Sequence, residues 1–307
     1  MFKDASLQSL LQQERTADLQ RTARERLAAQ PDDTQAVLAL AVASLNGNDA
    51  SARQSAINQA EACTQKQPQA AACHYALGVV LGVQAMSEGM MKAARSAATV
   101  KAALVQAQSL EPSWYPARSA LVEFYLLAPG LMGGSSTRAE ELAKAAPNPA
   151  QARVLQALVA LQAGQNESAL QSFTALLESA DSAVAEDAAD WGFGATARLV
   201  NDGKAPLAQA FLERLMRERP GSAQGPYGMG RVRAAAGAHA EALKLYEQAT
   251  SAKGAAMLPI DYRRGQSLQE LGRKDEARAA YTRYLSAGKG NKASLEDARK
   301  RLQDLGG

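Results

Sequence analysis

The stretch GAHAEALKLY, residues 237–246, decides the fold because its pattern recurs along the chain. The pattern is a glycine, an alanine five positions later, and a large apolar residue four positions after the alanine. Its glycines are 39, 34 and 35 residues apart, and its four copies are Gly164…Ala169…Phe173, Gly203…Ala208…Leu212, Gly237…Ala242…Tyr246 and Gly272…Ala277…Tyr281. Such a period predicts stacked helical hairpins.

Each position of the pattern has a physical role. Glycine ends a first helix by adopting positive φ without a Cβ penalty. The small alanine lets a second helix cross the first closely, and the large residue one turn later fills the space between them. Proline then stops the second helix. In the N-terminal half, prolines stand at expected repeat ends, 37, 44 and 35 residues apart, at Pro31, Pro68, Pro112 and Pro147.

Together with the Leu77-Gly78 pair, this pattern resembles the tetratricopeptide repeat. The resemblance implies an all-α, right-handed α-solenoid of helix–turn–helix repeats, about seven pairs plus terminal capping helices. We expect one superhelical domain over residues 1–307. Its expected parts are an N-terminal capping helix at 5–31, irregular repeats with insertions at 33–147, regular repeats at 149–288 and a C-terminal capping helix at 292–305.

Composition agrees with an all-α fold. Of the 307 residues, 47% are hydrophobic and only 5% aromatic, and much of the apolar fraction is alanine, the best helix former. Caps and periodicity predict helices near 5–29, 34–46, 50–66, 70–87, 90–109, 113–127, 136–146, 149–163, 166–179, 183–201, 204–218, 222–236, 239–251, 259–271, 274–287 and 292–305.

Two segments interrupt the repeat. Gly82–Thr99 delays one second helix by about ten residues, which predicts either extended helices or a lid. The loop Pro129–Ser135 is either a connector or an anion site at a helix start, although it lacks the lysine of a P-loop. Its Ala-Pro-x-x-x-Gly-Gly run resembles an interruption found in some bacterial extracytoplasmic repeat proteins.

The compartment follows from three observations. No stretch approaches the roughly 20 apolar residues that span a bilayer. The start, Met1 to Asp4, lacks a signal-peptide core. Cys63 and Cys73 flank a turn signal, so they either form a disulfide or are two separately buried thiols. We expect a periplasmic or otherwise extracytoplasmic bacterial protein whose leader is absent from this sequence, with the cytoplasm as the alternative.

Catalytic and metal-binding patterns are weak. The two histidines, His74 and His239, are 165 positions apart, no Gly-x-Ser-x-Gly elbow occurs, and His239 is expected to face solvent. The acidic stretch 178–190 reads as helix capping, or as a site for a cation or a basic partner. Two glycines, Gly192 and Gly194, predict close helix packing or a widened bend. We expect a non-enzyme with no cofactor and no metal.

The resemblance also implies which positions of each first helix face the concave side. The expected partner-binding residues are Tyr75, Glu123, Asp190, Phe193, Tyr227, Arg231, Tyr262 and Gln266. Aromatic and arginine side chains are enriched at interface hot spots. Alternatively, the tyrosines pack between repeats.

Charge is uneven along the chain. Residues 112–203 carry five basic and ten acidic groups, whereas residues 204–307 carry nineteen and eleven. The basic groups of the last third alternate with acidic ones at helical spacing, so we expect no nucleic-acid binding. We expect a scaffold that belongs to a cell-envelope assembly and binds, on its concave face, a protein or peptide segment that is acidic or has a free C-terminus. The alternative is a small-ligand or transporter-associated component with an enclosed pocket between residues 82–109 and the central repeats.

Overall fold

The all-α prediction is confirmed. In the computed structural model the described residues are 1–45, 49–288 and 290–306, and among them lie seventeen α-helices, two 3-10 turns and no β-strand. They form two compact units, Met1–Val159 and Ala160–Gly307, and each is described by itself. Whether they act as one superhelical domain stays a prediction.

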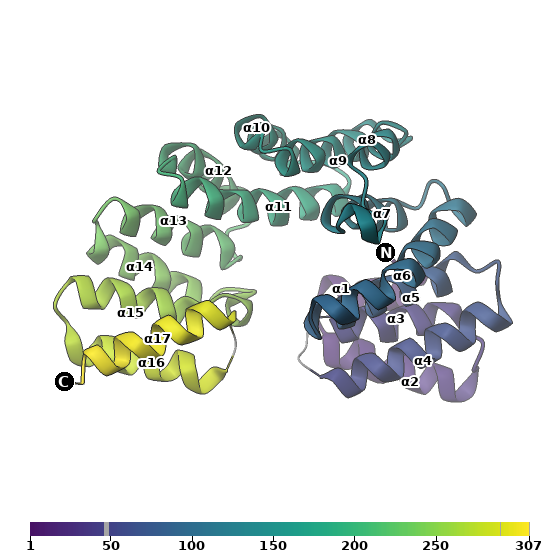
Figure 1. Ribbon diagram of the computed structural model, residues 1–307, viewed down its shortest axis with the longest axis horizontal. Helices are drawn as coiled ribbons and strands as arrows, with labels where there is room; N and C mark the ends of the chain where they lie inside the picture. The colour runs from purple at the N-terminus through teal and green to yellow at the C-terminus, as the bar shows by residue number, and fades with distance from the viewer. Residues whose placement is uncertain (46–48, 289, 307) are drawn as a thin grey trace. The chain divides into compact units, whose positions relative to one another are not determined.

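The N-terminal unit consists of consecutive helices joined by short turns (Figure 1). They are α1 (Ala5–Gln12), α2 (Thr16–Ala29), α3 (Thr34–Leu45), α4 (Ala50–Lys66), α5 (Ala71–Ser87), α6 (Met90–Leu110), α7 (Tyr115–Leu127), the 3-10 turn η1 (Gly130–Met132), α8 (Ser136–Lys144) and α9 (Pro149–Gln162), which contains the boundary.

The C-terminal unit continues the hairpin plan with α10 (Asn166–Leu176), α11 (Ser182–Asn201), α12 (Ala205–Glu218), α13 (Gln224–Ala235), α14 (His239–Thr250), η2 (Ala255–Met257), α15 (Ile260–Glu270), α16 (Lys274–Ala287) and α17 (Lys292–Asp304). Each glycine of the repeated pattern has the positive φ expected of a helix end, between 71° and 80°. The alanine and large apolar residue of all four copies are at most 1% exposed.

The prediction of a single helix over residues 5–29 was wrong, because the chain turns between α1 and α2. Glu14 adopts a φ of 52°, and the N–H of Arg15 donates to the carbonyl oxygen of Leu10 at 3.0 Å. Asp4 then caps α1 by accepting from the N–H groups of Ser6 and Leu7.

Both interruptions of the repeat have ordinary structural roles. Residues 82–99 form the extended ends of α5 and α6, as one of the two alternatives had it. In the Pro129–Ser135 loop, Ser135 caps α8 by accepting from the N–H of Arg138 at 3.3 Å. A Cβ on Gly134 would collide with the backbone of Ala128. The loop geometry therefore fits a connector.

Glycines on the first helices receive large side chains from the second helices. Added Cβ atoms on Gly230 and Gly265 would overlap the rings of Tyr246 and Tyr281, which belong to the repeated pattern. The absence of a side chain therefore lets each aromatic ring lie against the neighbouring helix backbone. Gly192 does the same for Phe211.

This packing predicts opposite results at two glycines of α11. Replacing Gly192 with alanine should lower the free energy of unfolding by ~1–3 kcal/mol, because the buried Phe211 ring and the Cβ of Phe173, 3.2 Å away, leave no room. Replacing Gly194 should raise it by ~0.5–1 kcal/mol, since nothing lies within 4 Å and alanine is the better helix former. Denaturant unfolding of both variants provides the measurement, and equal midpoints would contradict close packing at Gly192.

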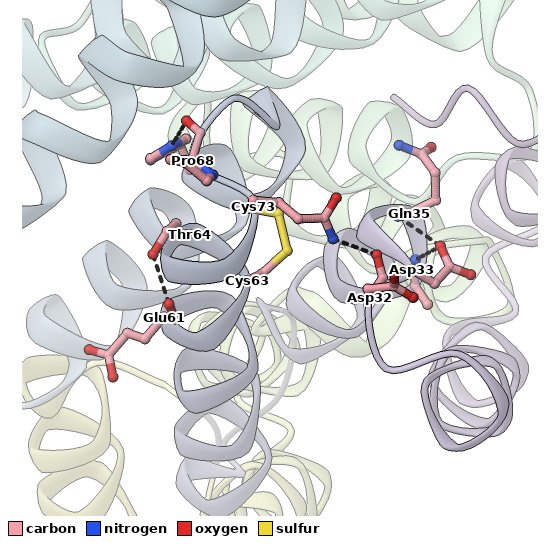
Figure 2. The surroundings of a disulfide bond; sticks show 11 residues. Asp32, Asp33, Gln35, Glu61, Cys63, Thr64, Pro68 and Cys73 are labelled. Carbon is pink, nitrogen blue, oxygen red and sulfur yellow. Dashed lines mark hydrogen bonds between the residues drawn. A yellow bond between two sulfur atoms is a disulfide. The ribbon is translucent and has the colours of Figure 1, made fainter.

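A disulfide joins α4 to α5. Cys63 near the end of α4 and Cys73 at the start of α5 are bonded, with their Cα atoms 5.5 Å apart (Figure 2). Both residues are buried, at 6% and 0% exposure. Nearby, Gln67 donates from Nε2 to the carbonyl oxygen of Asp32 at 2.6 Å. The bond thus closes a short turn within the core of the N-terminal unit.

Candidate functional site

In the N-terminal unit, the two expected partner-binding residues differ in exposure. Tyr75 on α5 is 6% exposed, and its ring centroid lies 4.9 Å from that of Trp114. Glu123 on α7 is half-buried and accepts from the hydroxyl of Ser119 at 3.5 Å. Tyr75 therefore offers a partner little surface.

Tyr227 and Tyr262 in the C-terminal unit are also buried, at 4% and 8% exposure. Their ring centroids lie 6.0 Å from that of Tyr246 and 5.3 Å from that of Tyr284, respectively. The hydroxyl of Tyr262 donates to Asp297 at 2.8 Å, and burial is the main cause that raises the pKa of Tyr262 to about 12. These tyrosines follow the packing alternative, because their rings fill the space between helices.

Four expected residues remain more accessible. Asp190 on α11 is exposed and accepts from Nε2 of Gln224 at 2.7 Å, and Phe193 is half-buried. Arg231 on α13 and Gln266 on α15 are half-buried. Helices α11, α13 and α15 are successive neighbours within the C-terminal unit (Figure 1). We call the surface that carries these residues the first-helix face.

A cleft of about 300 Å³ brings Arg231 and Gln266 together. It lies between the C-terminal ends of α11, α13 and α15, the start of α14, and α17. Its lining consists of Val200, Asn201, Arg231, Ala234, Ala235, His239, Tyr246, Arg263, Gln266, Ser267, Glu270 and Arg301. Three guanidinium groups therefore share one small cleft with the single carboxylate of Glu270.

Arg231 has only uncharged hydrogen-bond partners among the described residues. Its Nη2 donates to Oδ1 of Asn201 at 3.1 Å and, more weakly, to the carbonyl oxygen of Ala197 at 3.5 Å. Burial and then the nearby guanidinium of Arg263 lower the pKa of Arg231. Because the reference value is far above neutrality, Arg231 stays charged, but in an environment that disfavours its charge.

Arg263 is likewise without a carboxylate within the described chain. Its Nη1 donates to Oε1 of Gln266 at 2.9 Å, and its guanidinium lies 5.3 Å from the ring centroid of Tyr262. Its Nε is buried and makes no hydrogen bond in the part of the chain that the structure describes. Two of the three arginines therefore keep unused hydrogen-bonding capacity.

Arg301 differs, because Asp297 neutralises it. Its Nε donates to Oδ2 of Asp297 at 2.6 Å, and its Nη1 donates to Oε1 of Gln269 at 3.2 Å. Because this charge-assisted contact pairs Arg301 with a carboxylate on its own helix, Arg301 lines the cleft without adding an unpaired positive charge.

His239 was expected to face solvent, and it does so only in part. It is half-buried at the start of α14, lines the cleft, and has Nδ1 3.5 Å from the hydroxyl of Ser267. Arg263 and Arg301 were also missed as site residues, since their spacing in sequence is that of ordinary solvated helix faces. Only the stacking of α13, α15 and α17 brings them together.

The acidic stretch 178–190 has separate local partners. Asp181 caps α11 by accepting from the N–H groups of Ala183 and Val184, and Glu178 pairs with Arg214. Within the described residues no cluster of three or more metal-binding side chains occurs. Likewise, no described helix is long and apolar enough to cross a bilayer.

The enclosed pocket expected between residues 82–109 and the central repeats has no counterpart in the two clefts described. One is the cationic cleft, and the other, of about 390 Å³, is lined by residues within 164–207, including Gln165, Ser168 and Lys204. Both lie wholly in the C-terminal unit.

Comparison with known proteins gives a family match over part of the sequence and a fold match over nearly all of it. The tetratricopeptide-repeat family model matches residues 135–184. A search of curated proteins found no match. A tetratricopeptide repeat protein from Parabacteroides merdae ATCC 43184 is 16% identical, with 95% of this chain and 99% of that chain covered and a TM-score of 0.55. A human IFIT1 dimer with m7Gppp-AAAA is 14% identical, covering 95% and 68%, with a TM-score of 0.59.

At these identities the solved structures show the fold alone. The fold agrees with the repeated glycine, alanine and aromatic positions in the sequence, and the family match falls on one of the repeats that carry them. The chain therefore has the fold of a tetratricopeptide-repeat solenoid, and residues 135–184 match the model of that repeat family.

Proposed function

We propose that this protein is a non-enzymatic scaffold whose first-helix face holds an acidic segment of a protein partner. A fold of this kind generally serves protein interaction, because stacked repeats present an extended surface. The observation that carries the acidic preference is the pair Arg231 and Arg263, which share a cleft and have no carboxylate partner among the described residues.

The chemistry of the face suits an extended chain. Guanidinium groups bind carboxylates through paired N–H donors. Gln266, beside Arg263, offers an amide that can pair with a peptide group, and the half-buried Phe193 offers apolar surface. Asp190 lies on the same face, so a positive group of the partner placed near it would fix the direction of binding.

We also propose that the protein works outside the bacterial cytoplasm, in a cell-envelope assembly. The disulfide between Cys63 and Cys73 supports this proposal, because such bonds persist in oxidising compartments and are rare in the cytosol. The Ala-Pro-x-x-x-Gly-Gly run at residues 128–134 adds the resemblance to extracytoplasmic repeat proteins.

A displayed library of random peptides tests the acidic preference without a known partner. Selection on the wild-type protein, with removal of clones that also bind an Arg231→Ala, Arg263→Ala double variant, should enrich Asp and Glu. Enrichment of basic or uncharged peptides, or clones that bind both proteins equally, would count against the proposal.

For a selected acidic peptide, Arg231→Ala should weaken binding by ~1.5–2 kcal/mol, the lower part of the range for hydrogen bonds to charged groups, because the cleft is open to water. Added salt should weaken the wild-type complex more than that of the variant. Titration calorimetry at two salt concentrations measures both effects. The matched control is Arg278→Ala, an arginine that is 51% exposed and lies near Asp275.

A further inference from the structure

The cationic cleft holds more donors than its own acceptors use. Arg231 reaches only the amide oxygen of Asn201 and a distant carbonyl, and Nε of Arg263 is buried without a partner among the described residues. Tyr246, Ser267 and His239 also line the cleft. Buried donors are normally satisfied, so this excess indicates a ligand rich in acceptor oxygens.

The two arginines also disfavour each other. They come from adjacent helices, α13 and α15, and the charge of Arg263 is one of the causes that lower the pKa of Arg231. A bound anion would offset that repulsion with two attractions. Elements that destabilise the free protein in this way are typical of binding sites.

We propose that this cleft binds the phosphoryl group of a phosphate monoester. A phosphoryl group carries a charge of about −1.5 to −2 and three acceptor oxygens, so it can accept from Arg231 and Arg263 together and still have an oxygen left for a third donor. A carboxylate has two oxygens and one charge and would satisfy fewer of these donors. The inference rests on the proposed function, because it uses the same first-helix face as the binding surface. It adds the chemical group that is recognised there.

The size of the cleft leaves room for more than the phosphate. At about 300 Å³ it is at the lower end of the range for small-molecule sites, so part of the organic group that carries the phosphate would enter it as well. Glu270, at the exposed edge, is the one lining carboxylate and opposes an anion. Removing the charge of Glu270 therefore tests whether the bound ligand is an anion.

The experiment is titration calorimetry at constant ionic strength with four probes: inorganic phosphate, glucose 6-phosphate, a short phosphoserine peptide, and the same peptide with aspartate in place of phosphoserine. We expect saturable binding of one equivalent of the phosphorylated probes, at least tenfold tighter than the aspartate peptide. Tighter binding of the phosphopeptide than of glucose 6-phosphate would assign the group to a protein partner, and the reverse order to a small molecule.

Variants locate the binding. Arg231→Gln and Arg263→Gln should each weaken phosphate binding at least tenfold, Glu270→Gln should strengthen it severalfold, and Arg278→Gln should leave it unchanged. Arg231→Gln should also keep the thermal unfolding midpoint of the free protein, because it removes a repelled charge. If Arg231→Gln fails to fold, the other two variants still test the site, because Arg263→Gln should weaken phosphate binding and Glu270→Gln should strengthen it.

Three results would overturn the proposal: no saturable phosphate binding, equal affinity for the aspartate peptide, or weaker binding after Glu270→Gln. Selection of acidic, unphosphorylated peptides together with no phosphate binding would leave the proposed scaffold function standing and remove this inference alone. Phosphate binding without any selected acidic peptide would support this inference and count against the acidic preference of the proposed scaffold.

Discussion

Replacing Phe173 with alanine should lower the free energy of unfolding by ~3–5 kcal/mol, the range for deleting a buried aromatic ring. Phe173 is 0% exposed on α10, and its ring centroid lies 6.2 Å from that of Trp191. Its Cβ also faces Gly192, so α11 cannot move inward to fill the space without a backbone shift. The loss of the ring's contacts and the cavity that remains therefore both lower the free energy of unfolding.

Denaturant unfolding followed by circular dichroism measures this effect. The control is Gln171→Ala on the same helix, whose side chain is exposed and whose replacement should change the free energy of unfolding by less than about 0.5 kcal/mol. Equal small effects at both positions would mean that the repeat pattern does not place Phe173 in the core.

Removing the disulfide should have the next largest effect. Changing Cys63 and Cys73 to serine should lower the free energy of unfolding by ~2–3 kcal/mol, the value for a cross-link that closes a loop with a sequence separation of 10 residues. Reductant should lower the unfolding midpoint of the wild-type protein and leave that of the double variant unchanged.

A thiol assay tests the bond itself. Both cysteines are buried, so the assay must be made in denaturant, without reductant, on protein produced in an oxidising compartment. We expect no reactive thiol before reduction and two after it. Two reactive thiols before reduction would show that the disulfide is absent. The main support for an extracytoplasmic location would then be lost.

The sequence predicts much of the fold because the residues that end its helices act locally. Glycines such as Gly237 and Gly272 end first helices, and prolines limit second helices, so most helix bounds agree within two or three residues. The exception near Glu14 arises because its turn uses a positive φ at a residue that is neither glycine nor asparagine. The turns η1 and η2 were also missed.

The site was harder to predict because it depends on contacts between repeats. Family geometry identified Arg231 and Gln266, which do line the cleft. It also suggested Tyr227, whose ring is taken up by packing against Tyr246. Arg263 lies 32 positions after Arg231, and periodicity alone does not show that two such charges on neighbouring helices lack carboxylate partners.

The side-chain Nε–Hε resonances of arginine, followed by nuclear magnetic resonance during titration with the phosphoserine peptide, test the cationic cleft most directly. Assignment by single Arg→Lys variants identifies Arg231, Arg263 and the exposed Arg278. We predict large, saturable shifts at Arg231 and Arg263 and none at Arg278. Saturable shifts that are largest at Arg278, or shifts that grow in proportion at all three without saturation, would contradict binding in the cleft.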